Sequence, residues 1–380
     1  MKRQAALLLL TALAVWAQEN TAQLRQQALA LTAGGKYADA EPLLARALAE
    51  GEQEFGAQDP RLGDLLEQLA AVYRAEGKSP EAEKAYLRVL DLKEGALGTD
   101  SPELIPDLKQ LASLYGAISK YTDAERAYLR VILLRARAKG PDDLEVGKDT
   151  ADLAGFYAAR KQFAMAEPNL RQAILIVEKS LGPDDRALVA LLESLASTLI
   201  ELKNEKPAEA ALRRAISIQE RTYGPSASEV APNLDRLAML LYTEHRYPES
   251  EALYRRSLGI WEASPGADLA SSLDNLAVVC AAQEKYAQAE PLFQRSLMVR
   301  EEAAVDSLNN LALALEGEGK NAESERQYRL AVTLSEKIAA AGGGDRARQA
   351  RTVANYAALL RKLNRVEEAK KLEARAPAIR

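Results

Sequence analysis

The stretches Leu153-Ala154-Gly155-Phe156-Tyr157 and Phe163-Ala164-Met165-Ala166-Glu167 decide the fold, because both return along the chain at a fixed interval. The Leu-Ala pair recurs in steps of 42 residues, and its alanines are Ala70, Ala112, Ala154, Ala196 and Ala238. It continues less regularly at Leu276-Ala277, Leu311-Ala312 and Tyr356-Ala357. The second motif follows about thirteen residues behind, with its glutamate at Glu41, Glu83, Glu125, Glu167, Glu251, Glu290 and Glu325. Self-similarity of this length indicates a stacked repeat array.

Each repeat reads as two helices joined by a short turn. In residues 144–185, one apolar stripe runs through Leu153 to Tyr157 and a second through Phe163 to Val177, both at helical spacing. The polar residues 159–162 between them predict the turn. The unit closes with Leu181-Gly-Pro-Asp-Asp185. Its glycine can end a helix, its proline cannot continue one, and either aspartate can cap the next.

Smaller features refine this picture. Ala154 lies where helices cross, so a larger side chain there would overpack. Three prolines, which are Pro42, Pro168 and Pro291, are expected near the first turn of the second helix, where a missing N–H costs least. In the fifth unit Pro207 replaces the aromatic residue and Ala211 the glutamate, and the units from Leu269 and Val305 are shorter.

These motifs resemble the tetratricopeptide repeat, and the longer unit with its Leu-Gly-Pro-Asp linker resembles the kinesin-light-chain type. The resemblance covers nearly the whole chain and about nine second helices, from Tyr37 to Arg375. It implies an all-α, right-handed superhelical solenoid of stacked antiparallel helix pairs. It also implies a concave groove, lined by the first helix of each pair, in which a protein or an extended peptide binds.

The N-terminus predicts export. Met1-Lys-Arg3 is a positive segment, Ala5 to Val15 is apolar, and Val15-Trp-Ala17 suits a cleavage site, so residues 1–17 read as a signal peptide and 18–380 as the solenoid. An uncleaved N-terminal helix of a cytosolic array is the alternative. No other stretch is long enough and apolar enough to span a membrane. The single cysteine, Cys280, cannot form an internal disulfide, which is ordinary for an exported bacterial protein, periplasmic or secreted.

Composition and motifs argue against an enzyme. The net charge of −5 is spread along the chain and does not suit nucleic acid. The only histidine, His245, is expected in a solvated turn, and Cys280 is expected to be buried. No nucleotide loop, calcium loop or metal-ligand spacing appears, so we expect no catalytic residues, no metal and no cofactor. Asp142-Asp143 and Asp184-Asp185 recur at the unit breaks and are expected to cap helices.

The candidate binding residues follow from the family resemblance, which places an asparagine just before the Leu-Ala pair on the groove surface. That position holds Gln68, Gln110, Asp152, Ser194, Arg236, Asn275, Asn310 and Asn355. A carboxamide can both donate to and accept from a peptide backbone. Near them on the same face lie Asp64, Arg74, Lys148, Asp306, Arg351 and Arg361. Solvated helix positions without a ligand would show the same pattern.

Two functions remain open. The first is an exported, non-enzymatic scaffold that binds a protein or extended peptide in the groove of the solenoid. The second is a sensor or carrier that binds a small ligand or glycan within the superhelix, which would need groove aromatics that the sequence largely lacks. The identity of the partner and the oligomeric state do not follow from the sequence.

Overall fold

The structure, a computed structural model, describes residues 21–264, 269–343 and 345–375, and the expected signal peptide at 1–17 lies outside them. Every regular element in the described part of the chain is a helix, which confirms the all-α prediction. The chain divides into two compact units, one ending at Ala211 and the other beginning at Leu212. We call the first helix of each repeat its A helix and the second its B helix.

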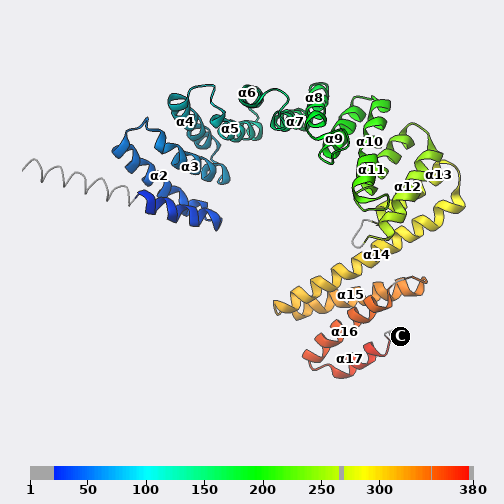
Figure 1. Cartoon of the computed structure of the whole chain (residues 1–380). Helices are drawn as coiled ribbons and strands as arrows, with labels where there is room; N and C mark the ends of the chain where they lie inside the picture. The colour runs from blue at the N-terminus through cyan, green and yellow to red at the C-terminus, as the bar shows by residue number, and fades with distance from the viewer. Residues whose placement is uncertain (1–20, 265–268, 344, 376–380) are drawn as a thin grey trace, which may run out of the picture. The chain divides into compact units, whose positions relative to one another are not determined.

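The first unit stacks helix pairs as the sequence predicts (Figure 1). A helix over 21–33 pairs with α2, and each later A helix pairs with the B helix after it. The elements are α2 (Tyr37–Phe55), η1 (Pro60–Leu62), α3 (Gly63–Ala75), α4 (Ser79–Leu97), η2 (Pro102–Leu104), α5 (Ile105–Ala117), α6 (Tyr121–Lys139), α7 (Leu144–Ala159), α8 (Phe163–Leu181) and α9 (Leu188–Glu201). The helix α10 (Glu205–Tyr223) carries the boundary between the units.

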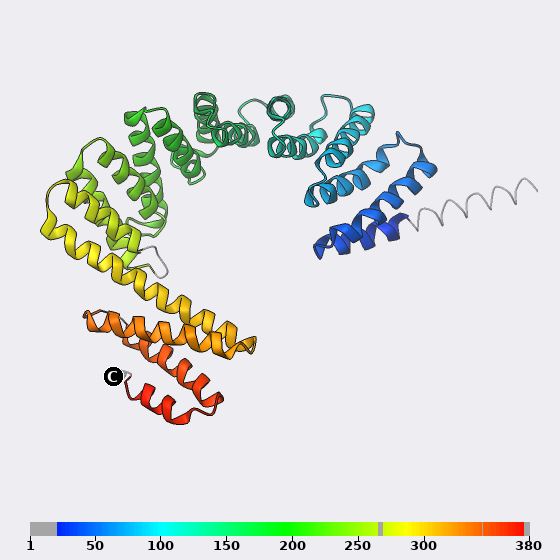
Figure 2. The same ribbon diagram turned by 180° about the vertical axis from the view of Figure 1, so that it is seen from behind.

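The second unit departs from the predicted pattern at one junction. Its elements are α11 (Ala231–Thr243), α12 (Tyr247–Glu262), α13 (Leu269–Ala282), α14 (Tyr286–Gly317), α15 (Asn321–Ala340), α16 (Arg346–Lys362) and α17 (Val366–Glu373). The sequence predicts a capped break between every B helix and the next A helix, but α14 is one helix of 32 residues that serves as both (Figure 1, Figure 2). The prediction of a break there is wrong.

Local sequence explains where helices end and where they do not. The B helices α2, α4, α6, α8 and α10 are each followed by a glycine with φ between 86° and 96°, a conformation that side chains with a Cβ disfavour. At the corresponding place α14 has Glu301-Glu-Ala-Ala304, which are good helix formers. The Leu-Ala step from Ala277 to Ala312 is 35 residues, seven fewer than the steps of 42 residues between Ala70 and Ala238. The helix therefore continues.

The turns between A and B helices share one backbone feature. One residue in each has a positive φ, between 57° and 76°: Gly35, Gly77, Ser119, Lys161, Lys203, His245, Glu284, Gly319 and Asn364. His245 thus occupies a standard turn position, where it is exposed as predicted and its Nδ1 lies 2.7 Å from the hydroxyl of Tyr247. Its place in the chain follows from turn geometry and does not indicate catalysis.

We call the alanines of the recurring Leu-Ala pair the ladder alanines. They lie where the sequence places them, and the aspartates at the unit breaks were expected to cap helices. Ala154 and its equivalents are buried at helix crossings, and Cys280 is fully buried. Asp143 Oδ1 accepts a bond from the Glu145 N–H at 2.9 Å, and Asp185 Oδ1 accepts one from the Ala187 N–H at 2.8 Å. The prediction of small crossing residues is confirmed, and the cap prediction holds for Asp143 on α7; Asp185 instead bonds within the turn before α9, which has no side-chain cap.

Two local predictions are wrong. Pro42, Pro168 and Pro291 lie inside their helices, at the sixth residue, so each removes a backbone hydrogen bond of the second turn. In the fifth unit α10 begins at Glu205, so Glu205 takes the aromatic position and the motif continues as Ala208-Glu209. Pro207 and Ala211 are therefore not the substituted positions.

The repeated glutamate of the second motif has a structural role that the sequence reading did not assign. In four repeats it forms an ion pair with the basic residue that immediately precedes the next B helix. The pairs are Glu41–Lys78, Glu83–Lys120 at 2.6 Å, Glu251–Lys285 at 2.7 Å and Glu325–Arg365 at 2.7 Å. Each pair joins consecutive repeats, and the glutamates are largely screened from solvent.

Candidate binding surface on the A helices

The predicted site residues all lie on A helices, two positions before the ladder alanine, and all are partly or fully exposed. Gln68, Gln110 and Asp152 are on α3, α5 and α7 of the first unit. Arg236, Asn275, Asn310 and Asn355 are on α11, α13, the second half of α14 and α16 of the second unit. The structure shows which of these side chains are engaged within the protein, and the two units differ in this respect.

In the first unit the predicted residues bond to basic side chains of the preceding A helix. Arg25 lies 2.9 Å from Asp64, and its guanidinium also donates to the Gln68 amide oxygen once the amide is oriented to satisfy both groups. Arg74 donates to the Gln110 oxygen at 2.8 Å. These bonds run across the face on which a ligand would lie, so a ligand would have to compete with them.

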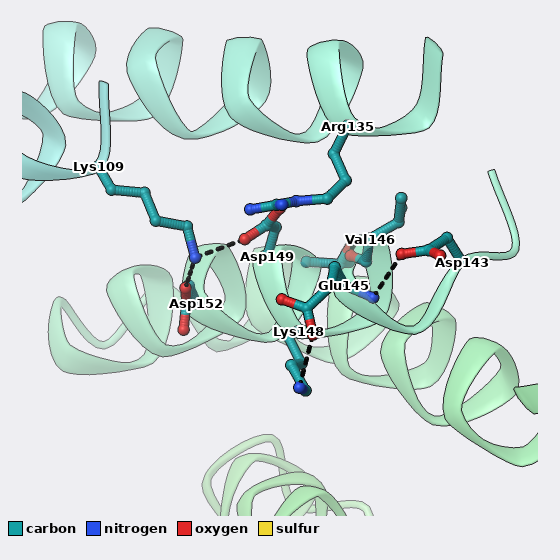
Figure 3. Close-up of polar contacts among 9 residues, drawn as sticks. Lys109, Arg135, Asp143, Glu145, Val146, Lys148, Asp149 and Asp152 are labelled. Carbon is teal, nitrogen blue, oxygen red and sulfur yellow. Dashed lines mark hydrogen bonds and ion pairs between the residues drawn. The ribbon is translucent and has the colours of Figure 1, made fainter. Parts of the chain in front are cut away.

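Asp152, the third predicted residue of the first unit, belongs to an ionic cluster between α5, α6 and α7 (Figure 3). Lys109 bridges Asp152 at 2.9 Å and the buried Asp149 at 2.5 Å, and Arg135 donates to the other oxygen of Asp149 at 2.6 Å. Burial disfavours the charged Lys109, but its bonds to the two aspartates outweigh this and raise its pKa. Asp152 is thus part of the packing between repeats.

The second unit leaves more of its carboxamides available. Asn355 donates to the buried Asn309 at 3.0 Å, and Arg236 lies 3.4 Å from the Asn233 oxygen. The side chains of Asn275 and Asn310 form no hydrogen bond with any other residue in the described part of the chain. Their donors and acceptors can be satisfied by water or by a bound molecule.

An apolar row beside the carboxamides was missed by the sequence reading. The residue directly after the ladder alanine is three positions from the predicted site residue, so the two share one helix face. In the first unit this residue is small, as Ala71, Ser113, Gly155 and Ser197. On α11, α13 and α14 of the second unit it is Met239, Val278 and Leu313, which are 47%, 41% and 44% exposed, and on α16 it is again small, as Ala358. The signal was present in the repeat register, one position beyond the ladder.

The sequence of this chain matches known repeat patterns over most of its length. The sequence pattern of the tetratricopeptide repeat matches residues 18–95, 63–137, 149–221 and 229–302, and a second pattern of that name matches 304–339. The chain belongs to the tetratricopeptide repeat family. No curated protein matches it.

Solved structures similar to this tetratricopeptide repeat chain include BtubC (BKLC) from P. vanneervenii, with 19% identity and a TM-score of 0.48 over 62% of this chain and 91% of that one. They include a putative kinesin light chain with nearly identical TPR-like repeats from Podosopora anserina, with 21% identity and a TM-score of 0.46 over 53% and 95%. They also include aspartyl phosphate phosphatase F from Bacillus subtilis, with 14% identity and a TM-score of 0.48 over 94% and 93%.

Other chemistry has little support in this tetratricopeptide repeat array. Among residues 21–264, 269–343 and 345–375, no three histidine, cysteine or acidic side chains are grouped as a metal site would require. Within the same residues no helix has the length and apolar character needed to cross a membrane. Burial raises the pKa of the Cys280 thiol, which makes it a poor nucleophile at neutral pH.

Proposed function

We propose that this chain is an exported, non-enzymatic scaffold that binds an extended protein segment along the A helices of its second unit. The observation that carries the proposal is the paired row on three successive A helices: Arg236 with Met239, Asn275 with Val278, and Asn310 with Leu313. Each pair places a polar group that can bond a peptide amide next to an exposed apolar side chain. Tetratricopeptide repeats commonly bind proteins or peptides, which supports the same reading.

The chemistry of the row suits a peptide with alternating side chains. An extended segment presents backbone N–H and C=O groups between its side chains, and Asn275 and Asn310 can bond both kinds of group. Met239, Val278 and Leu313 can then cover apolar side chains of the ligand, and the burial of apolar surface would supply most of the affinity. Methionine suits this role because its flexible side chain adapts to different partners.

The binding proposal is tested with peptides displayed as a library of extended nine-residue sequences and selected on the full chain. Selected peptides are then titrated by calorimetry against the parent, a double variant with Asn275→Ala and Asn310→Ala, and a double variant with Val278→Ser and Leu313→Ser. Both variants should bind at least tenfold more weakly. Their thermal melting should stay close to that of the parent, because exposed helix substitutions usually change stability by about 0.5 kcal/mol or less.

A matched control replaces Gln110 and Ser113, which occupy the same two positions of an A helix in the first unit. Gln110→Ala with Ser113→Ala should bind the selected peptides as the parent does. If this control loses affinity while the second-unit variants keep it, the ligand lies on the first unit and the proposed row is wrong.

Export rests on the form of residues 1–17 alone, with its basic, apolar and small-residue segments. Expressed in a Gram-negative host, the chain should be recovered outside the cytoplasm and begin at Gln18. Edman sequencing of the recovered protein measures this directly. A chain that keeps Met1 and remains in the cytoplasm would contradict the export proposal but leave the binding proposal intact.

A further inference from the structure

The fused helix α14 leaves bare a surface that other junctions between repeats cover. Its residues Tyr286, Phe293, Leu297, Ala304 and Leu311 are exposed and are spaced by 7, 4, 7 and 7 positions. That spacing places them on one side of a helix, and they extend over about 38 Å of its length. We call these five residues the α14 stripe.

Equivalent positions elsewhere show what the stripe normally does. Phe293 is 42% exposed, whereas six residues at the same place in other B helices, Leu44, Tyr86, Leu170, Leu212, Tyr254 and Tyr328, are buried, and a seventh, Tyr128 of α6, is half-buried. Leu297 is 59% exposed, whereas its equivalents Leu90, Ile174, Ile216, Leu258 and Val332 are buried, and Leu48 and Ile132 are half-buried. These B-helix positions ordinarily contact the A helix of the following repeat.

The C-terminal half of the stripe corresponds to the A-helix surface that such B-helix residues normally contact. Leu311, which is 47% exposed, holds the ladder position that is buried at Leu69, Leu111, Leu153, Leu195, Leu237 and Leu276. Within the second unit, Tyr254 and Leu258 of α12 and Leu273 and Leu276 of α13 share one apolar cluster. In α14 the same two surfaces lie end to end on one straight helix, so they cannot reach each other.

We propose that the α14 stripe packs against the α14 stripe of a second copy of this chain. The two α14 helices are antiparallel and are related by a twofold axis. The B half of each helix then packs on the A half of the partner's helix. Phe293 and Leu297 of one copy cover Leu311 of the other, as Tyr254 and Leu258 cover Leu276 within one chain. This is domain swapping, in which the contact that a linker normally allows within a chain is made between chains.

A second copy fits better than an unrelated partner because the surface is complementary to itself. Each half of the stripe corresponds to one side of an ordinary junction between repeats. The first half is therefore complementary to the second half. A twofold axis satisfies both halves with one symmetric interface. The stripe also lies apart from Asn310 and Leu313, which are on another side of the same helix, so dimerisation leaves the proposed peptide surface open.

The mass in solution is the first test. Light scattering coupled to gel filtration on the full chain should give twice the 41.3 kDa of one chain. Phe293→Glu with Leu297→Glu should give a monomer of unchanged helicity, since these side chains are exposed within one chain. The control is Leu330→Glu on α15, because Leu330 is 56% exposed but lies outside the stripe, and it should remain dimeric. A parent of single-chain mass at micromolar concentration would overturn the proposal.

Disulfide trapping tests the register, in a chain that carries Cys280→Ala. Phe293→Cys and Leu311→Cys together should give a covalent dimer on a non-reducing gel after mild oxidation. Either substitution alone should give none, because the two positions meet only each other across the axis. Dimers from a single substitution would indicate a different pairing. A faster-migrating monomer from the double variant would show that α14 bends back on itself, and either outcome would refute the swapped dimer.

Discussion

Replacing Asp149 with leucine should destabilise the packing of α6 on α7, because it leaves two cations without their shared carboxylate. The Asp149 side chain is about 1% exposed, and Arg135, which is 18% exposed, loses its partner at 2.6 Å. Removing one member of a buried ion pair typically costs about 3–5 kcal/mol. Lys109 keeps its contact with Asp152 and is itself one-third exposed. We therefore expect the lower end, about 3 kcal/mol.

The next junction between repeats suggests a second substitution that should restore the lost stability. The positions of Arg135 and Asp149 are occupied between α8 and α9 by Val177 and Leu191. The double variant Arg135→Val with Asp149→Leu should therefore recover most of the loss, to within about 1 kcal/mol of the parent, since an apolar pair can replace a buried ionic pair.

Urea unfolding followed by circular dichroism measures the free energies, and hydrogen exchange at α6 and α7 shows whether the loss is local. A single variant that loses less than about 1 kcal/mol would show that the cluster is screened as a surface pair is. A double variant no more stable than Asp149→Leu alone would refute the equivalence between the two junctions.

Three further changes test other features of the fold. Ala154→Leu should lower stability by about 1–3 kcal/mol in thermal melts through overpacking, and unchanged melting would contradict the close helix crossing. Gly182→Ala should cost about 1–3 kcal/mol, because φ 96° and ψ 162° suit only glycine; a neutral result would mean that the backbone relaxes there. Burial alone would raise the pKa of Glu251, but hydrogen bonds from Lys285 and Arg255 hold it at about 2, below its unfolded value. Its stabilisation, about 3 kcal/mol, is present above about pH 4.3 and is lost as pH falls toward 2, so Glu251→Gln should flatten acid unfolding across that range.

The repeat ladders predicted the helix pairs because burial in a solenoid follows the same positions in each unit. Ala154, Leu153 and Tyr157 are buried as their spacing requires, and the glycines after the B helices mark the breaks. The fused helix was not predicted, although its signal was present. Periodicity shows that two apolar faces exist, but only the residues between them decide whether the chain turns back, and Glu301 to Ala304 contain no helix breaker.

The sequence predicted which helices carry the candidate residues but not the contacts that these residues make. The sequence placed Gln110 and Asn275 on equivalent faces, and that equivalence holds. It could not show that Arg74, 36 residues away, already bonds Gln110, since such a contact depends on how adjacent repeats stack. The same dependence hid the role of the repeated glutamate, whose partner Lys285 lies 34 residues beyond Glu251.

The unbroken α14 also has a consequence for how the second unit unfolds. In a repeat array, cooperativity is transmitted from neighbour to neighbour through the interfaces between repeats. Within α14 that transmission passes along a single backbone cylinder, with no side-chain interface between its two halves. Unfolding that starts at α17 can therefore stop near residue 301, because the two halves of α14 share no side-chain interface whose loss would carry unfolding into the first half. In a single chain, α15 to α17 should melt as a separate block at lower temperature than α11 to α13.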